Sequence, residues 1–207
     1  MDIQFYGANC VTFTFKGKRV VVDDNLADLG GKTILKPDDV ALFTSAHGAA
    51  VSSRLTLDGP GEFEVSDISI IGLIARAHID EPGKKNATMF KLVFGELSVL
   101  VTGHVYPELS DAQLEAIGII DVLIVPVGGN GYTLDPAGAL KLIKDIEPKL
   151  VIPTHYADKA LNFPVPQQDL SNALKELGME PKETTAKLRL KPHELSDITQ
   201  LTVLEKS

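Results

Sequence analysis

Apolar and polar residues alternate with a period of two through much of the first half of the chain, and short turns interrupt the alternation. This pattern turns one row of side chains toward a core and the other toward solvent, as in antiparallel β-hairpins. Residues 11–15 and 19–23 alternate on either side of Gly17, and residues 89–94 and 97–102 form a second such pair. The sequence therefore predicts that the N-terminal half is built mainly from hairpin strands.

Helix signals appear only in the second half. Ser110 is a good N-cap before an acidic first turn, and Asp135 is an N-cap followed by proline at the first helical position. Residues 121–127 and 149–153 are continuous apolar runs, as expected of buried strands. Strands followed by mixed strands and helices suit two sheets packed face to face with helices outside. No linker divides the chain, so residues 1–207 are expected to form a single domain.

Composition excludes several classes of function. The formal net charge is -8, whereas nucleic-acid binding depends on basic side chains that neutralise phosphates. The single cysteine, Cys10, cannot form an intrachain disulfide, and its place at the start of an alternating strand favours a buried packing role. No signal peptide is evident, and no apolar run reaches the roughly 20 residues of a membrane span. We therefore expect a cytoplasmic protein that binds neither nucleic acid nor membrane.

Four of the five histidines follow the end of an apolar strand. They are His47, His78, His104 and His155, which come after residues 40–44, 68–75, 97–102 and 150–152. Strand ends that share one edge of a sheet could bring the four rings together, and clustered imidazoles are ligands for zinc and similar metals. For any one histidine alone, a local hydrogen bond in its loop explains the position better. The fifth, His193, lies in a polar stretch and is expected to be exposed.

Three other polar residues are candidates for substrate binding. Ser45 precedes His47 in a loop of small residues, Asn130 lies in a Gly-rich loop after an apolar strand, and Tyr156 follows His155. Loops after strands commonly present side chains into a site. Turn chemistry explains Asn130 equally well. Tyr132, in the same Gly-rich loop, could also line a substrate pocket.

At this point the chain resembles the metallo-β-lactamase superfamily, over nearly its whole length. Residues 42–50 are similar to the signature T-H-x-H-x-D-H, residues 20–23 resemble the "I-D-P" segment with Asp24 in place of the proline, and residues 151–155 match the last metal histidine. More narrowly, the chain looks like small metal-dependent hydrolases related to ascorbate-6-phosphate lactonase. The fold class that this resemblance implies is α+β, a four-layer αβ/βα sandwich of two mixed β-sheets with a metal site at one edge between them.

The departures from the resemblance fall in the metal site. His47 matches the second signature histidine, but Ser45, Ala49 and Ala50 stand where the family has histidine, aspartate and histidine. His104 stands in place of the bridging aspartate. A bridging carboxylate supplies negative charge that helps to hold two dications, and neutral imidazole supplies none. Two metals are therefore not expected, whereas one metal held by histidines leaves an open position for water or substrate.

The resemblance implies a mononuclear metal-dependent hydrolase acting on a small ester, lactone or phosphorylated metabolite. Its metal ligands would be His47, His78, His104 and His155, holding one zinc or other divalent transition-metal ion. Catalytic residues are not assigned, although Asp80 and Glu81 lie near His78 and are candidate bases.

Two alternatives remain open. The first is a catalytically inactive, metal-free relative that serves as a ligand-binding or scaffold protein. Assembly into a homo-oligomer is compatible with this alternative. The second is a metal-free enzyme with Ser45 as nucleophile and His47 as base. In each case the expected partner is a small molecule.

Overall fold

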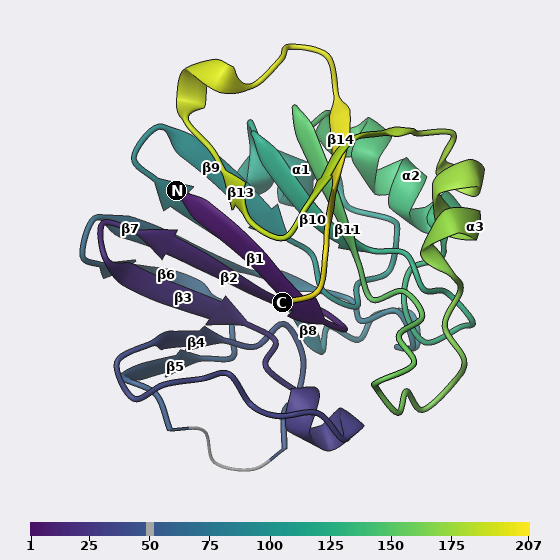
Figure 1. Ribbon diagram of the computed structural model, residues 1–207, viewed down its shortest axis with the longest axis horizontal. Coiled ribbons are helices and arrows are strands. Elements are labelled where there is room, and N and C mark those ends of the chain that lie inside the picture. The colour runs from purple at the N-terminus through teal and green to yellow at the C-terminus, as the bar shows by residue number, and fades with distance from the viewer. Residues whose placement is uncertain (49–51) are drawn as a thin grey trace.

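The computed structural model describes residues 1–48 and 52–207, and these residues form two β-sheets packed face to face (Figure 1). One sheet has the order β13-β1-β2-β3-β4-β5 and the other has the order β12-β14-β11-β10-β9-β8-β7-β6. The strands of the first sheet are β1 (Asp2–Gly7), β2 (Cys10–Phe15), β3 (Lys18–Val22), β4 (Val40–Leu42), β5 (Leu55–Leu57) and β13 (Leu188–Arg189). Those of the second are β6 (Gly61–Val65), β7 (Ile68–Ala75), β8 (Ala87–Phe94), β9 (Leu97–Val101), β10 (Val122–Pro126), β11 (Leu150–Thr154), β12 (Pro181–Thr185) and β14 (Gln200–Leu204).

Both sheets are mixed, which confirms the predicted α+β sandwich. Strands β1, β2 and β3 pair antiparallel, and β3, β4 and β5 then pair parallel. In the second sheet β6 to β9 form an antiparallel meander, and β10, β11, β14 and β12 continue it in parallel from β9. The hairpins predicted around Gly17 and between residues 89 and 102 correspond to β2–β3 and β8–β9.

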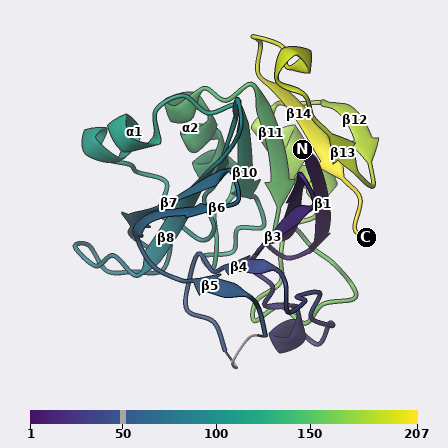
Figure 2. The ribbon, with the colours of Figure 1, turned by 90° about the vertical axis from the view of Figure 1, so that its left-hand side faces the viewer.

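The helices cover the outer face of the larger sheet (Figure 2). They are α1 (Asp111–Ile117), α2 (Pro136–Ile146) and α3 (Leu170–Leu177), and short 3-10 helices occur at η1 (Leu26–Leu29) and η2 (Pro192–Glu194). Ser110 caps α1 in a capping box with Gln113, and Asp135 caps α2 ahead of Pro136, as predicted. None of the helices within the described ranges is long and apolar enough to cross a membrane.

Three apolar clusters hold the layers together. The largest lies between the sheets, where Phe13 of β2 packs against Phe94 of β8 with ring centroids 5.5 Å apart. A second joins the larger sheet to its helices. The third covers the outer face of the smaller sheet with η1 and loops, and it contains Cys10, which is fully buried as expected. The outer layer on that side is therefore thin, because loops and one 3-10 turn form it.

Parallel pairing explains where the histidine loops emerge. Val101, Ile124 and Ile152 are paired in register across β9, β10 and β11, so the segments after these strands leave the sheet at one edge. Val22 and Leu42 are likewise in register across β3 and β4. The residues that follow these strands consequently gather at edges of the two sheets, which is where ligands bind in open α/β sheets.

The packing of β7 generates a stability prediction. Ile70 is fully buried between the sheets, whereas Ile74 in the same strand is 43% exposed. Ile70→Ala should lower the free energy of unfolding by about 2–5 kcal/mol through lost burial and a residual cavity. The matched Ile74→Ala should cost about 1 kcal/mol or less, measured by urea unfolding. Equal losses in the two variants would contradict this packing.

Candidate functional site

A cavity of about 270 Å³ opens at the edge where the parallel strands end. His104 and His155 line it from the loops after β9 and β11, and Tyr132 lines it from the loop after β10. Ser45 and Asp28 contribute from the smaller sheet. The cavity therefore lies between the two sheets, as the resemblance implies for the site.

His104 and His155 are in direct contact. Their ring centroids are 4.5 Å apart in an edge-to-face arrangement, and the Tyr132 ring lies 5.1 Å from His104 and 5.7 Å from His155. Burial lowers the pKa of His155 to about 4. Burial, together with the neighbouring His155 and His78, holds the pKa of His104 well below its ordinary value. Both rings are consequently neutral near neutral pH, and each keeps a nitrogen lone pair.

Gln167 fixes the tautomer of His155. Its Nε2 donates to the carbonyl of Val165 at 2.9 Å, so its Oε1 is the atom that faces His155 Nδ1 at 3.0 Å. Nδ1 must therefore carry the hydrogen and donate it, which leaves the lone pair on Nε2. This hydrogen bond orients the ring in the way that outer partners orient metal-binding histidines.

Asn9 holds His104 in a comparable way. One amide atom of Asn9 lies 3.1 Å from His104 Nε2, and the other pairs with the Thr154 hydroxyl at 3.0 Å. His104 Nδ1 is buried and has no hydrogen-bond partner among the described residues. As placed, the amide nitrogen of Asn9 donates to Nε2 and its oxygen accepts from the Thr154 hydroxyl, so the ring hydrogen of His104 is on Nδ1; the reversed amide would leave the lone pair on Nδ1 instead.

His78 lies beside this pair. Its backbone N–H donates to the His104 carbonyl at 2.8 Å, and its buried Nδ1 likewise lacks a hydrogen-bond partner within the described part of the chain. The nearby candidate base Asp80 holds the loop, because it accepts hydrogen bonds from Ala77 and Asn86. Desolvation opposes ionisation of this carboxyl, but those hydrogen bonds lower its pKa overall. Asp80 is therefore a structural residue of this loop.

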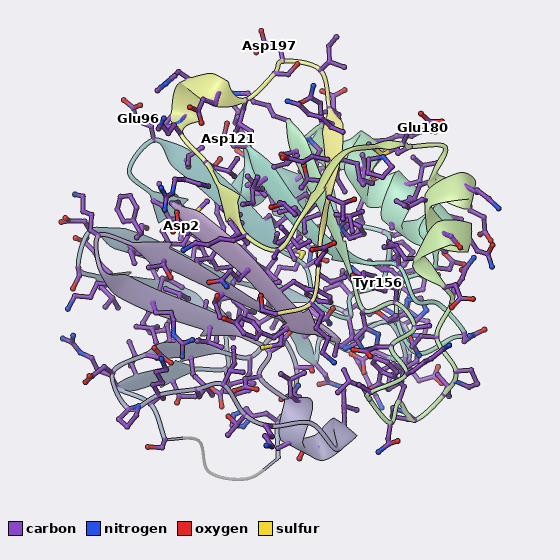
Figure 3. The ribbon with its side chains drawn as sticks, in the orientation of Figure 1. Asp2, Glu96, Asp121, Tyr156, Glu180 and Asp197 are labelled. Carbon is purple, nitrogen blue, oxygen red and sulfur yellow. The ribbon has the colours of Figure 1, made fainter. Side chains whose placement is uncertain are left out.

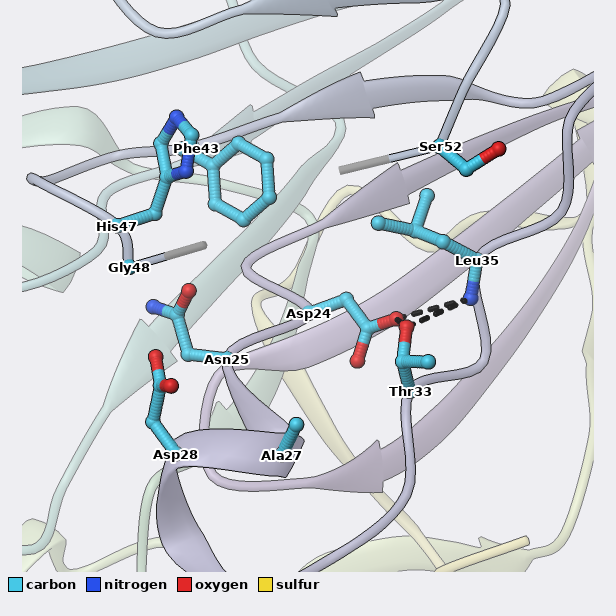
Figure 4. A pocket seen from close by; sticks show the side chains of 10 residues that line it. All are labelled: Asp24, Asn25, Ala27, Asp28, Thr33, Leu35, Phe43, His47, Gly48 and Ser52. Carbon is cyan, nitrogen blue, oxygen red and sulfur yellow. Dashed lines mark hydrogen bonds between the residues drawn. The ribbon is translucent and has the colours of Figure 1, made fainter. Parts of the chain in front are cut away.

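His47 lies in an adjoining cavity of about 310 Å³ (Figure 4). Its ring stacks on Phe43 with centroids 3.9 Å apart, and its Nε2 lies 3.5 Å from a carboxylate oxygen of Asp58. The two cavities share Asn25 and Asp28 in their linings. The structure thus brings His104 and His155 together with His78 beside them, and it places His47 in the neighbouring cavity.

The imidazole nitrogens of this site are suitable ligands for one metal ion, but their present positions do not form a binding site. His78 and His104 each have a buried nitrogen without a partner in the described chain, and Gln167 leaves His155 Nε2 free. In residues 1–48 and 52–207, however, no group of three or more His, Cys, Asp or Glu side chains is placed to hold a metal. Binding by these rings would thus require at least one side chain to turn. Ala49 and Ala50, which stand at signature positions, lie outside the described residues.

The three predicted substrate-binding residues have different positions. Ser45 lines the cavity of His104 and His155. Asn130 donates its side-chain N–H to the carbonyl of Pro166 and has a φ of 54°, so it supports a turn. The Tyr156 hydroxyl donates to the carbonyl of Leu204 at 3.3 Å, and the ring lines a separate cavity beside Phe5 (Figure 3). Neither Asn130 nor Tyr156 lines the histidine cavity.

Four polar residues that line this cavity were not predicted from the sequence. They are Asn9, Asn25, Asn162 and Asp28, which belong to loops or to η1. Asn9 follows Gly7 and Ala8, both of which have positive φ angles. That tight turn between β1 and β2 is the local feature that directs Asn9 inward, but one sequence does not reveal it.

A short buried network supports the cavity edge. Asp23 accepts the backbone N–H of Thr44 at 2.7 Å and its hydroxyl at 2.6 Å. Gly103, with a φ of 62°, packs so closely that a Cβ atom there would lie 2.1 Å from Thr44 Oγ1. The residue before His104 must therefore be glycine for the two sheets to meet at this point.

Comparisons with known proteins agree with this architecture. A family model described as the β-lactamase superfamily domain matches residues 2–155. The UPF0173 metal-dependent hydrolase of Carboxydothermus hydrogenoformans is 46% identical over 71 residues, or 34% of this chain and 31% of that protein. The UPF0173 protein of Pyrococcus furiosus is 28% identical over 131 residues, or 63% of this chain and 58% of that protein. The chain therefore spans less than two thirds of either relative's length.

A solved structure extends the likeness to nearly the whole chain. A candidate Zn-dependent hydrolase of the metallo-β-lactamase superfamily from Thermotoga maritima is 26% identical, with a TM-score of 0.75, and the match covers 99% of this chain and 98% of that chain. None of these three relatives is named for ascorbate-6-phosphate lactonase activity. That narrower resemblance therefore stays a prediction.

The contact between Gly103 and Thr44 can be tested with a matched glycine. Gly95 also has a positive φ, of 67°, but the nearest atom to an added Cβ there is Phe15 Cζ at 3.6 Å. Gly95→Ala should cost about 1 kcal/mol from backbone strain alone. Gly103→Ala should cost about 1–3 kcal/mol more, because Thr44 must move. Chemical unfolding measures both, and similar costs would contradict the close contact.

Asp23 generates a pH prediction. Burial raises its pKa from the ordinary value of 3.8 to about 6, so the folded state binds the proton more tightly than the unfolded chain. Its stabilising effect is complete below the unfolded pKa and is lost as pH rises through about 6. Asp23→Asn can keep both hydrogen bonds with Thr44, with the amide nitrogen donating to Oγ1. The free energy of unfolding of wild type minus that of Asp23→Asn should fall by about 3 kcal/mol between about pH 3 and pH 7. A constant difference would contradict the shift.

Proposed function

Because the chain belongs to the β-lactamase superfamily domain family and has the metallo-β-lactamase fold, we propose that it is a hydrolase of small esters or lactones that uses at most one metal ion. The names of its relatives support metal dependence. The observation that carries the proposal is the contact between two neutral, desolvated histidines in a cavity at the edge between the sheets. The backbone N–H of His78 donates to the His104 carbonyl, so His78 lies on the adjoining loop.

In this proposal His78, His104 and His155 hold the ion, and His47 remains a predicted ligand only if its ring turns. The low pKa of His155 supports a ligand role, because a base with a pKa of about 4 accepts protons poorly at neutral pH. A bound divalent transition metal would lower the pKa of its water and supply hydroxide near neutral pH. The absence of a bridging carboxylate at His104 supports one ion and not two.

The other lining residues bind and orient the substrate. Ser45 and Asn162 offer neutral hydrogen-bonding groups, and Tyr132 lies against both histidines. Neither Lys nor Arg occurs among the described residues that line this cavity, and Asp28 adds a carboxylate. An anionic phosphoryl group would have only the metal ion as counter-charge and would face the Asp28 carboxylate, so we favour an ester or lactone over a phosphorylated metabolite.

Metal content after purification without chelator tests this proposal. Wild type should bind about one zinc, iron or manganese ion per chain. His104→Ala and His155→Ala should each lose roughly tenfold or more in metal affinity and in ester or lactone hydrolysis, because each removes a ligand. The matched control, His193→Ala, changes an exposed histidine far from the cavity lining and should retain both properties.

Three outcomes would redirect the proposal. Absence of metal after loading with zinc, iron and manganese would reject it in favour of the metal-free ligand-binding alternative. Metal loss in His47→Ala would show that His47 turns toward the same ion. Hydrolysis that persists without metal would instead favour the metal-free enzyme with Ser45.

A further inference from the structure

The cavity beside His47 has no role in the proposed metal site. It is lined by Phe43 and Leu35 on its apolar side and by Asp24, Asp28 and Asn25 on its polar side (Figure 4). Its volume of about 310 Å³ is in the range of pockets that take small molecules. The cavity therefore combines apolar walls with a few polar side chains, as small-molecule binding sites do.

The carboxylates of this lining belong to Asp24 and Asp28, and none of the described residues that line the cavity is Lys or Arg. His47 also lines the cavity, but its Nε2 faces Asp58 at 3.5 Å. Both side-chain oxygens of Asp28 face Gly48, where an added Cβ would lie 3.1 Å and 3.2 Å from them. In the part of the chain that the structure describes, no cationic side chain pairs with Asp28 or Asp24. The cavity thus carries negative charge without an internal counter-ion.

Of the two carboxylates, Asp24 gives the stronger indication of a cationic ligand. Its side chain is buried, with only 7% exposed, and its Oδ2 accepts hydrogen bonds from Thr33, Ile34 and Leu35. Its Oδ1 is buried and has no partner in the described chain. Figure 4 shows this carboxylate between Ala27 and Leu35 in the lining. A buried carboxylate oxygen without a partner carries a large desolvation cost, which a cationic ligand would offset.

Asp24 is also a departure from the family pattern. It stands where the "I-D-P" segment has proline, a residue that could supply neither the charge nor these hydrogen bonds. Metal-site chemistry does not account for it, because within the described ranges no three His, Cys, Asp or Glu side chains are placed to hold an ion. The apolar side of the cavity, with Phe43 and Leu35, fits the alkyl part of an organic molecule better than a hydrated metal.

We propose that this cavity binds the ammonium group of an organic cation, with Asp24 and Asp28 as counter-charges and Phe43 and Leu35 against its alkyl chain. Asp28 and Asn25 also line the His104–His155 cavity, so a bound cation would extend toward it. Where the cation is part of the substrate, the inference rests on the proposed function and narrows it to amine-bearing esters or lactones.

Binding of unreactive alkyl probes tests the proposal, measured by ligand-observed NMR titration. The probes are n-hexylammonium, n-hexanol and hexanoate, which share one chain and differ in charge. Hexylammonium should bind roughly tenfold or more tightly than hexanol, and hexanoate should not bind. Equal binding of the three, or no binding of hexylammonium, would overturn the proposal.

Variants locate the binding. Asp28→Asn should weaken hexylammonium binding roughly five- to tenfold, because it removes one of the two charges. Ala27→Leu keeps both carboxylates but fills the cavity from exposed η1, and it should also weaken binding. The matched control Glu96→Gln removes one charge at the exposed turn between β8 and β9 (Figure 3) and should bind as wild type. If Glu96→Gln weakened hexylammonium binding equally, the protein's net charge would explain the effect, and the proposed site would be rejected.

Competition with inorganic cations completes the test. Displacement of hexylammonium by millimolar calcium or magnesium would identify a metal site and overturn the organic-cation proposal. Retention of hexylammonium in their presence supports it. Because hexylammonium cannot be hydrolysed, this binding can succeed while the metal and hydrolysis tests of the proposed function fail, and the reverse also holds.

Discussion

The buried hydrogen bonds between Asp23 and Thr44 support the edge on which both cavities open. Asp23 follows β3 and Thr44 follows β4, so their two hydrogen bonds tie the ends of neighbouring parallel strands. The Thr44 carbonyl also accepts the Thr88 N–H of β8 at 2.8 Å, which connects the two sheets. Gly103 packs on the same threonine. The loops that carry Ser45 and His104 therefore share one buried support, and a change in it would reach both.

Period and capping signals were enough to predict much of the fold. Alternation around Gly17 predicts β2 and β3, and Ser110 and Asp135 begin α1 and α2 as expected. The apolar run at residues 40–44 also predicts β4, but β5 has only three residues and was not predicted, and the parallel pairing of the two strands depends on partners distant in the sequence. The thin outer layer over the smaller sheet could not be predicted either, since loops around Leu161 and η1 form it by tertiary packing.

The sequence predicts which edge of the sheets carries the histidine loops, but not how the side chains in those loops are oriented. His104 and His155 share one cavity because β9 and β11 flank β10 in parallel, as the strand-end spacing indicates; their role as metal ligands stays a prediction. Spacing does not give the direction of a side chain within a loop. The His47 ring turns toward Phe43 and Asp58, and Tyr156 turns toward Leu204, for reasons of local packing that no sequence pattern contains.

Asp28 lines both cavities from η1, a single short turn of 3-10 helix. Asn25 lines both cavities as well, so these two side chains lie between spaces of about 310 Å³ and 270 Å³. A molecule long enough to reach past them would contact both cavities. The length of a guest molecule, as well as its charge, is then a property that this protein can discriminate.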